Sequence, residues 1–286
     1  MQITVYAPAK INLTLDIVGV REDGYHLLES IFQSVSIYDT IVVKKTWGRG
    51  IRLVADKCDC PVEKNTAYKA AQAFFRYTGL KKGVKIKLEK HIPQQAGMGG
   101  GSADAAGVLW ALNRLFDTRL TIAQLCEIGL TVGADVPFCV MGGTAFVTGI
   151  GEGLQPLPSL PDCYIVVAQP EQGISTKEAY AAVDNAEILA RPDHAAALAA
   201  LKEGDLVGVC KQAVNVFESA TNLEGVKEIR HRMEEYAPLC TQMTGSGSCV
   251  FAIFEDRWAA MDCQADLQQD YSTCFVCRPC NGMAEE

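Results

Sequence analysis

The stretch QQAGMGGGSADAAGVLWALNRLF, residues 94–116, decides what this chain can be. Glycine lacks a Cβ, so a run of glycines can adopt backbone angles closed to other residues and leave amide N–H groups uncovered. From Ala103 onward apolar residues recur at helical spacing, and Ser102 and Asp104 favour a helix start. We therefore predict a glycine loop that leads into a helix N-terminus, with these loop glycines: Gly97, Gly99, Gly100 and Gly101.

Such a loop favours an anion, because unpaired N–H groups and the positive end of the helix dipole converge there. It is not a P-loop, since no lysine separates Gly101 from Ser102. It also lacks the acidic residue that a dinucleotide-binding fingerprint places about 20 positions further on, at a strand end. We predict a phosphate site; the alternative is a flexible turn that caps an ordinary core helix.

Composition limits the classes of protein to consider. With 286 residues, 49% hydrophobic and 21% charged, the chain has the profile of a soluble protein of two domains. No apolar run approaches the ~20 residues of a membrane span, and the start MQITVYAPAKINL has no secretory pattern. A net charge of −8 argues against nucleic-acid binding. We expect a cytoplasmic protein without membrane or nucleic-acid partners, as a monomer or weak homodimer.

Strand and helix patterns surround the loop. The opening residues alternate apolar and polar side chains, which predicts two strands interrupted at Pro8. A helix follows later, with Asn65 or Thr66 as its cap and Gly79 as its stop. Further strands are predicted at residues 39–46 and 51–56, and a strand that buries Val84, Ile86 and Leu88 leads into the glycine loop.

The second half begins near residue 157, where a proline cluster precedes a buried strand. This gives domains at residues 1–157 and 158–286. Both halves mix strands and helices without a strict βαβ repeat, so the predicted class is α+β. Helices are predicted at residues 121–130, 177–183, 191–201 and 225–235, with a last helix and a cysteine-containing strand after them.

Twelve cysteines are many for a chain of this size. Most stand singly in apolar surroundings and are expected to behave as small hydrophobic residues. The tail is different, because its cysteines recur at short intervals: Cys263, Cys274, Cys277 and Cys280. They could bind zinc or an iron–sulfur cluster, but the paired knuckles of a zinc ribbon are missing. We expect an edge strand that carries oxidation-sensitive surface thiols.

Polar residues in apolar segments are candidates for chemistry. Lys10 and Asn12 share one face of a strand, Tyr25 and His26 follow a turn, and Asp135 precedes a proline. Taken singly, each would be a solvated or satisfied polar residue. Beside a phosphate site, an aspartate can accept the proton of an attacking hydroxyl, and a lysine can keep that aspartate ionised. Spacing alone does not show that these residues meet.

Three ordered motifs resemble those of the GHMP family of small-molecule kinases: PAKINL from Pro8, PQQAGMGGGSADAA from Pro93, and MTGSGSCVF from Met243. The likeness extends over residues 3 to about 255 and includes DGYH, GADVPF and ISTKEAY. It implies a two-domain fold, with an ATP-binding domain like ribosomal protein S5 domain 2 followed by a ferredoxin-like domain. It also implies Mg²⁺-dependent transfer of the ATP γ-phosphoryl group to the 2-hydroxyl of diphosphocytidyl methylerythritol, in non-mevalonate isoprenoid synthesis.

The resemblance also implies roles for single residues. Asp135 would be the base and Lys10 its partner, with Asn12 positioning the erythritol. The cytosine would stack on Tyr25, His26 would read its edge, and Tyr180 would be the second aromatic face, as proteins grip an unpaired base. The third motif would close the site through Thr244, Gly245 and Ser246. The ATP phosphates would be wrapped by Pro93, Gln94, Gln95, Ala96, Gly97, Met98, Gly99, Gly100, Gly101, Ser102 and Ala103.

The resemblance also assigns roles to two further positions. Ser102 is the hydroxyl expected next to Mg²⁺, and Asn65 either contributes to the nucleotide pocket or only caps its helix.

The departures from the family pattern are small: Met98 in place of leucine, Ala103 in place of serine, and Cys139 in place of an aromatic residue. The alternatives are another GHMP kinase acting on homoserine, mevalonate or a sugar, a catalytically dead relative, and a metal or redox sensor built on the cysteine tail.

Overall fold

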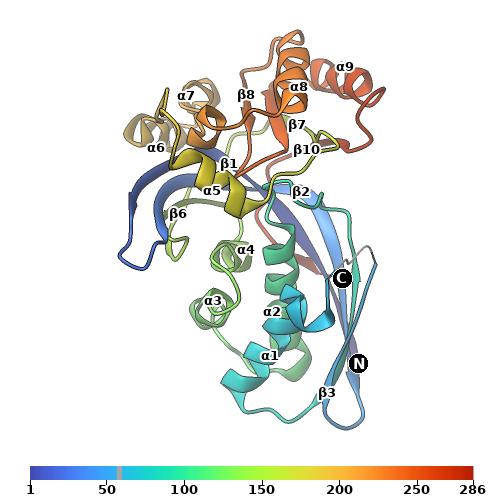
Figure 1. The fold of residues 1–286 in the computed structure, drawn as a ribbon. Helices are drawn as coiled ribbons and strands as arrows, with labels where there is room; N and C mark the ends of the chain where they lie inside the picture. The colour runs from blue at the N-terminus through green and yellow to red at the C-terminus, as the bar shows by residue number, and fades with distance from the viewer. Residues whose placement is uncertain (57–59, 286) are drawn as a thin grey trace.

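A long hairpin organises the fold. In the computed structural model, which describes residues 1–56 and 60–285, β1 (Gln2–Val20) and β2 (His26–Thr46) pair antiparallel over most of their length (Figure 1). The predicted break at Pro8 is wrong. The strand continues, and the pairing register shifts between Pro8 and Ala9. A bulge of this kind accommodates a residue without an N–H donor.

The larger sheet is built around this hairpin. Its order is β11 (Ala284–Glu285), β1, β2, β4 (Gly83–Glu89) and β3 (Gly50–Ala55). A different segment of β2 pairs with β5 (Thr144–Gly149), and β5 in turn pairs with β6 (Gly153–Leu157). The predicted inward face of β4 is confirmed, because Val84, Ile86 and Leu88 are buried while the residues between them are exposed.

Helices cover one face of this sheet (Figure 1): α1 (Thr66–Thr78), α2 (Gly100–Phe116), α3 (Ile122–Leu130) and α4 (Val136–Met141). The caps predicted for α1 are confirmed, since Asn65 accepts a hydrogen bond from Ala67 N and Gly79 is left-handed. A short 3₁₀ turn, η1 (Val62–Lys64), precedes it. The predicted start of α2 was too late. The helix begins at Gly100, so Asp104 lies inside it rather than capping it.

The second half forms a separate antiparallel sheet, in the order β10 (Cys274–Cys277), β7 (Tyr164–Ala168), β9 (Val250–Phe254) and β8 (Cys240–Met243). Packed on it are α8 (Glu224–Glu234) and α9 (Arg257–Leu267). In the chain between β7 and α8 come α5 (Thr176–Val183), α6 (His194–Glu203), α7 (Leu206–Lys211) and η2 (Val216–Ser219). The α+β class is confirmed. Among the described strands, those up to β6 lie in the first sheet, and β11 alone returns to it. The boundary at residue 157 stays a prediction.

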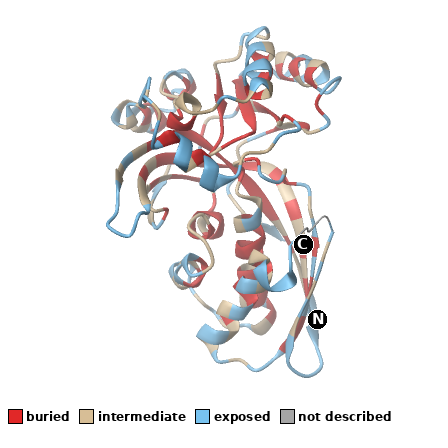
Figure 2. Ribbon diagram, viewed as in Figure 1, coloured by how far each residue is buried: buried red, intermediate tan, exposed pale blue. Residues whose placement is uncertain are grey.

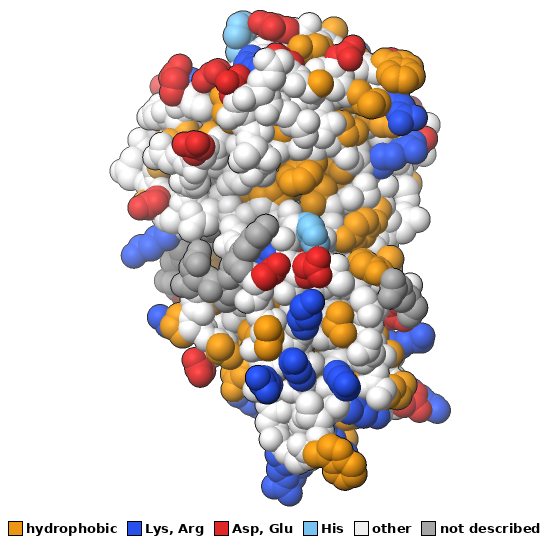
Figure 3. All heavy atoms as spheres, turned by 90° about the vertical axis from the view of Figure 1, so that its right-hand side faces the viewer, with side chains coloured by type: hydrophobic (Ala, Val, Ile, Leu, Met, Phe, Trp, Pro, Cys, Tyr) orange, Lys and Arg blue, Asp and Glu red, His pale blue; other side chains and the backbone are white. Residues whose placement is uncertain are grey.

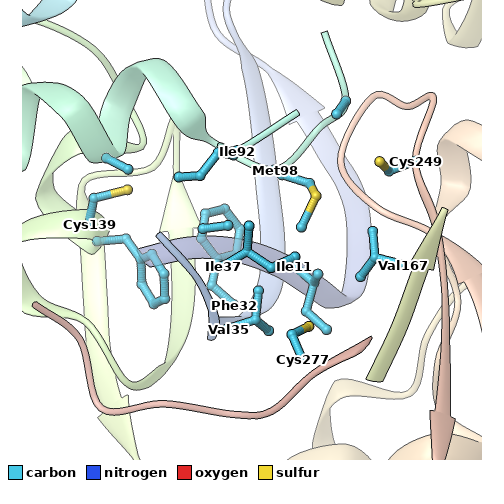
Figure 4. Close-up of a cluster of buried hydrophobic side chains, with 14 of the residues drawn as sticks. Ile11, Phe32, Val35, Ile37, Ile92, Met98, Cys139, Val167, Cys249 and Cys277 are labelled. Carbon is cyan, nitrogen blue, oxygen red and sulfur yellow. The ribbon is translucent and has the colours of Figure 1, made fainter. Parts of the chain in front are cut away.

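One continuous hydrophobic core joins the halves (Figure 2). Figure 4 shows Met98 of the glycine loop in the same cluster as Ile11 of β1 and Val167 of β7. Cys249, which precedes β9, lies on the same side of Met98 as Val167 in that view. The glycine loop is therefore held by apolar contacts with both sheets.

The prediction of surface thiols in the tail is largely wrong. Cys263, Cys274 and Cys277 are buried, and Cys280 is partly buried. Burial raises the pKa of the Cys263 and Cys274 thiols to about 12, so they stay protonated and unreactive at neutral pH. The strand is, as predicted, at an edge, and its cysteines pack inward. Within residues 1–56 and 60–285, no set of three His, Cys, Asp or Glu side chains is arranged to hold a metal ion.

The outer face of the larger sheet is exposed and basic. Lys85 on β4 lies opposite Lys44 of β2 and Arg52 of β3. Within the described residues, none of these three side chains forms an ion pair. Figure 3 shows Lys and Arg side chains gathered on this face. This face is therefore basic, although the chain as a whole carries a net negative charge. No described helix is long and apolar enough to cross a bilayer.

Candidate active site

The three motif segments meet at one point. Lys10 N donates a hydrogen bond to Met98 O at 3.0 Å, and Asn12 N donates to the Thr244 hydroxyl at 3.0 Å. That hydroxyl lies 3.5 Å from the carbonyl oxygen of Gly97. A Cβ on Gly97 would stand 2.1 Å from the Thr244 carbonyl oxygen, so this approach requires glycine. Segments from both halves of the chain therefore form one backbone junction.

A cavity of about 1030 Å³ opens beside this junction. We call it the central cavity. Of the residues predicted to hold ATP, Asn65 and the whole run from Pro93 to Ser102 line it, whereas Ala103 is fully buried in α2 outside the lining. Eight of the nine residues predicted to hold the substrate or catalyse its reaction also line it, among them Lys10, Asn12, Tyr25, His26 and Asp135. Tyr180, Gly245 and Ser246 line it as well, while Thr244 is buried behind the wall.

Lys10 and Asp135 are brought together across the cavity. Lys10 Nζ lies 3.7 Å from Asp135 Oδ2 and donates a hydrogen bond to Asn12 Oδ1 at 2.7 Å. The ammonium group also sits 4.6 Å from the centre of the Phe32 ring. The Lys10 side chain is almost completely buried, whereas that of Asp135 keeps 35% of its surface exposed. The lysine is thus fixed, and the carboxylate remains open to the cavity.

The backbone around Asp135 explains this openness. Asp135 is the residue before α4, with Pro137 in the first turn, and its side chain makes no capping hydrogen bond. The backbone N–H groups of α4 therefore do not bind this carboxylate. Asn12 is held more tightly, because its Nδ2 donates to Ser30 Oγ at 2.9 Å. The sheet thereby fixes the amide whose oxygen binds Lys10.

The glycine loop presents a helix N-terminus to the cavity. Gly97 and Gly99 have φ values of 71° and 70°, and Gly99 is the left-handed residue immediately before α2. A Cβ on Gly99 would be 3.0 Å from the Lys10 side chain, so the glycine permits the lysine to pass. Unpaired N–H groups of the first turn, together with the helix dipole, suit an anion. Ser102 in that turn adds a hydroxyl to the lining.

Aromatic residues gather at another part of the cavity. The rings of His26 and Tyr180 lie 4.6 Å apart and are inclined by 30°, and Phe217 packs edge-on against Tyr180 at 4.9 Å. Burial raises the pKa of the Tyr180 hydroxyl to about 12, and Asp135 adds to this effect. Tyr25 is 59% exposed and lies 5.6 Å from the Arg21 guanidinium. All four of these rings, Tyr25, His26, Tyr180 and Phe217, line the central cavity.

Sequence reasoning missed several residues of the site. Asp184, at the end of α5, bonds His26 Nε2 at 2.7 Å, and Phe32 lies beneath Lys10. Lys90 lies below the start of α2, where it binds two aspartates. Each of these contacts joins residues far apart in the chain. No local pattern in the sequence could have indicated them.

The chain matches two family models. The model described as GHMP kinases N terminal domain covers residues 65–143, and the one described as GHMP kinases C terminal covers residues 197–273. A homoserine kinase structure from Cytophaga hutchinsonii has a TM-score of 0.78 at 18% identity, covering 100% of this chain and 97% of that one. At that identity the likeness shows a shared fold.

Full-length relatives are more similar. A protein of Clostridium tetani (strain Massachusetts / E88) named 4-diphosphocytidyl-2-C-methyl-D-erythritol kinase is 42% identical, over 96% of this chain and 99% of the relative. One of the same name from Clostridium beijerinckii is 41% identical over 97% and 99%. A crystal structure titled 4-(cytidine 5'-diphospho)-2C-methyl-D-erythritol kinase superposes with a TM-score of 0.82 at 34% identity, covering 97% and 98%. The chain belongs to the GHMP kinase family.

Proposed function

We propose that this protein transfers the γ-phosphoryl group of ATP to the 2-hydroxyl of 4-diphosphocytidyl-2-C-methyl-D-erythritol, in the non-mevalonate route to isoprenoid precursors. One observation carries the proposal. The Lys10–Asp135 pair, the helix N-terminus at the glycine loop and the His26–Tyr180 ring pair all line a single cavity. Relatives with this name are about as long as this chain and match it almost throughout.

Asp135 is suited to act as the general base. Its carboxylate would accept the proton as the substrate oxygen forms a bond to the γ-phosphorus. The bond from that phosphorus to the bridging oxygen breaks, and ADP leaves with the electron pair. Lys10 would keep the carboxylate ionised and stabilise charge on the phosphoryl oxygens. Both functions require a cation beside the carboxylate, which the 3.7 Å separation provides.

The glycine loop would hold the phosphates through backbone N–H groups at the start of α2. Ser102 and Asp135 bring hard oxygen donors to the same cavity, which fits Mg²⁺, an ion usually bound by few protein ligands and by the phosphates themselves. Bound there, Mg²⁺ would neutralise phosphate charge. Asn65 both caps α1 and lines the cavity, so the two interpretations of this residue are compatible.

The aromatic part of the cavity would hold the cytosine. Stacking on aromatic rings with edge hydrogen bonds is the usual grip on an unpaired base. Tyr25 and Tyr180 would supply faces, and His26 would present a ring nitrogen to the base edge. The bond from His26 to Asp184 fixes the orientation of the imidazole. A small polyol or amino acid would leave these rings without a partner.

The test is ATP consumption by the purified protein with Mg²⁺ and one alcohol at a time. Four acceptors are compared: 4-diphosphocytidyl-2-C-methyl-D-erythritol, mevalonate, homoserine and galactose. We expect turnover with the cytidyl substrate alone. Turnover confined to another alcohol would discard the cytosine site while keeping the kinase, and a failure to consume ATP with any of them would contradict the kinase assignment for this chain.

The domain boundary, the cytoplasmic location and the monomeric or weakly dimeric state remain predictions from the sequence.

A further inference from the structure

One buried amide holds the backbone of the third motif. Asn215, which is only 2% exposed, donates from Nδ2 to the carbonyl oxygen of Met243 at 2.7 Å and to that of Gly245 at 2.8 Å. These two carbonyl groups lie on either side of Thr244 in the chain. A single side chain therefore fixes the backbone both before and after Thr244.

The position requires an amide and not only its volume. Asn215 Oδ1 accepts a hydrogen bond from Phe217 N at 3.1 Å and so caps η2. Carbonyl oxygens can only accept hydrogen bonds, so the group that faces Met243 and Gly245 must be the NH₂ group. An aspartate of the same shape would place an oxygen against two carbonyl oxygens. The two donated hydrogen bonds are therefore specific to asparagine.

Glu218, in the same 3₁₀ turn, holds the other side of Met243. Its Oε1 accepts a hydrogen bond from Met243 N at 2.6 Å, and its Oε2 accepts one from Arg230 Nη1 of α8 at 3.0 Å. Met243 is thus bound at its N–H by Glu218 and at its C=O by Asn215. The end of β8 is consequently fixed to η2 through both polar groups of one residue.

Thr244, the residue that Asn215 brackets, contacts the proposed reaction centre. Its hydroxyl accepts a hydrogen bond from Asn12 N and lies 3.3 Å from Asn12 Oδ1. The same Oδ1 atom accepts the hydrogen bond from Lys10 Nζ. A displacement of Thr244 would therefore move the amide that orients Lys10 toward Asp135.

We propose that Asn215, together with Glu218, is a positioning residue for phosphoryl transfer. Neither side chain lines the central cavity, so each acts through the third motif. They hold Thr244 in the place where it supports Asn12. The proposal rests on the transfer reaction proposed above. Transfer is sensitive to small displacements of the reacting groups, whereas the glycine loop and the aromatic rings keep their other contacts. Loss of these hydrogen bonds should therefore reduce transfer more than binding.

The first test is Asn215→Asp, which keeps the shape of the side chain and the acceptor for Phe217 N but removes the donor. We expect kcat to fall by about tenfold or more, while KM for ATP and for the cytidyl substrate stays within a few-fold of wild type. Asn222→Asp alters an exposed amide outside the lining of the central cavity and should resemble wild type. A folded Asn215→Asp protein with the kcat of wild type, or with a change in KM alone, would overturn the proposal.

Hydrogen exchange, followed by mass spectrometry, separates positioning from a general loss of stability. In Asn215→Asp, the amides of residues 244–249 should exchange several-fold faster, while those of β7, inside the second sheet, should keep their wild-type rates. Faster exchange throughout the chain would mean that Asn215 only stabilises the fold, and would overturn the proposal. Wild-type protein that transfers no phosphoryl group would instead overturn the proposed function, so the two failures are distinct.

Glu218 provides a second pair of variants, which decides the matter if Asn215→Asp does not fold. Glu218→Leu removes the acceptor for Met243 N and should lower kcat at least several-fold. Glu218→Gln keeps an acceptor oxygen and should restore part of that loss. Arg230 is half-exposed and also bonds Glu234, so it does not depend on Glu218 alone. Equal losses in the two variants, or no loss in either, would overturn the role of Glu218 as the acceptor that positions Met243.

Discussion

The ammonium group of Lys10, on the first strand, lies 3.7 Å from the carboxylate of Asp135, at the start of α4. Neither residue reaches the other through local structure. The sheet fixes Lys10 through Asn12 and Phe32, and the turn before α4 leaves Asp135 without a capping role. The pair is thus a product of the tertiary fold, with the charged oxygen facing the cavity.

The Asp135→Asn variant should lose phosphoryl transfer and keep nucleotide binding. An amide cannot accept the substrate proton at neutral pH, so kcat is expected to fall by roughly 10²–10⁴-fold. The Kd for Mg²⁺–ADP should stay within a few-fold of wild type. Steady-state kinetics and calorimetry measure the two quantities. Asp162→Asn changes an exposed carboxylate outside the cavity lining and should behave like wild type; near-normal turnover in Asp135→Asn would exclude the proposed base.

The Tyr25→Ala variant should bind the cytidyl substrate more weakly. Loss of one stacked ring costs about 1–3 kcal/mol, which corresponds to a rise in KM of roughly 5- to 150-fold. The effect on KM for ATP should be small, because the glycine loop lies elsewhere in the cavity. Tyr25→Phe keeps the ring and is the matched control. If Tyr25→Ala had the KM of wild type for the cytidyl substrate, the cytosine would have to lie elsewhere.

Local patterns in the sequence were sufficient for much of the fold. The cap at Asn65, the stop at Gly79 and the alternating burial of β4 follow from rules that act over a few residues. The same rules failed at Pro8, where pairing with β2 carries the strand through a bulge. They also placed the start of α2 too late, because they assigned Asp104 to the cap. In the structure that carboxylate binds Lys90 instead.

The site was predictable only in part. The residue types at Lys10, Asp135 and the glycine loop suggested phosphoryl transfer, but family resemblance was needed to connect them. Contacts between distant segments had no signal in the sequence, such as His26 with Asp184. The exposure of the tail cysteines was mispredicted for the same reason. Their strand pairs with β7, and Cys274 and Cys277, which point to opposite faces of the sheet, are both buried by the segments packed against those faces.

The Gly97→Ala variant should disturb the junction of the three motifs. Its Cβ would lie 2.1 Å from the Thr244 carbonyl oxygen, a backbone atom that cannot move freely. The φ of 71° adds strain for any residue with a Cβ. We expect a loss of unfolding free energy of roughly 2 kcal/mol or more and a large loss of activity.

The control for this variant is Gly204→Ala. Gly204 has a similar φ of 69°, but no atom lies within 4 Å of the added Cβ. This change should cost only the backbone strain, about 1 kcal/mol, and should leave activity intact. Urea denaturation measures both. Equal destabilisation of the two variants would mean that the close approach of Gly97 to Thr244 contributes nothing.

Stability should depend on pH through Asp104. The pKa of this carboxyl group is about 7 in the folded protein and near its ordinary value of 3.8 when unfolded, because burial disfavours the charge. The folded state therefore holds the proton more tightly, and this contribution to stability is lost as pH rises from about 4 to 7. Asp104→Asn does not titrate. Its unfolding free energy, relative to wild type, should be greater at pH 8 than at pH 5 by on the order of 2 kcal/mol. Urea denaturation of both proteins at the two pH values measures this difference, in which all other titrating groups cancel. A difference independent of pH would show that Asp104 is ionised throughout this range.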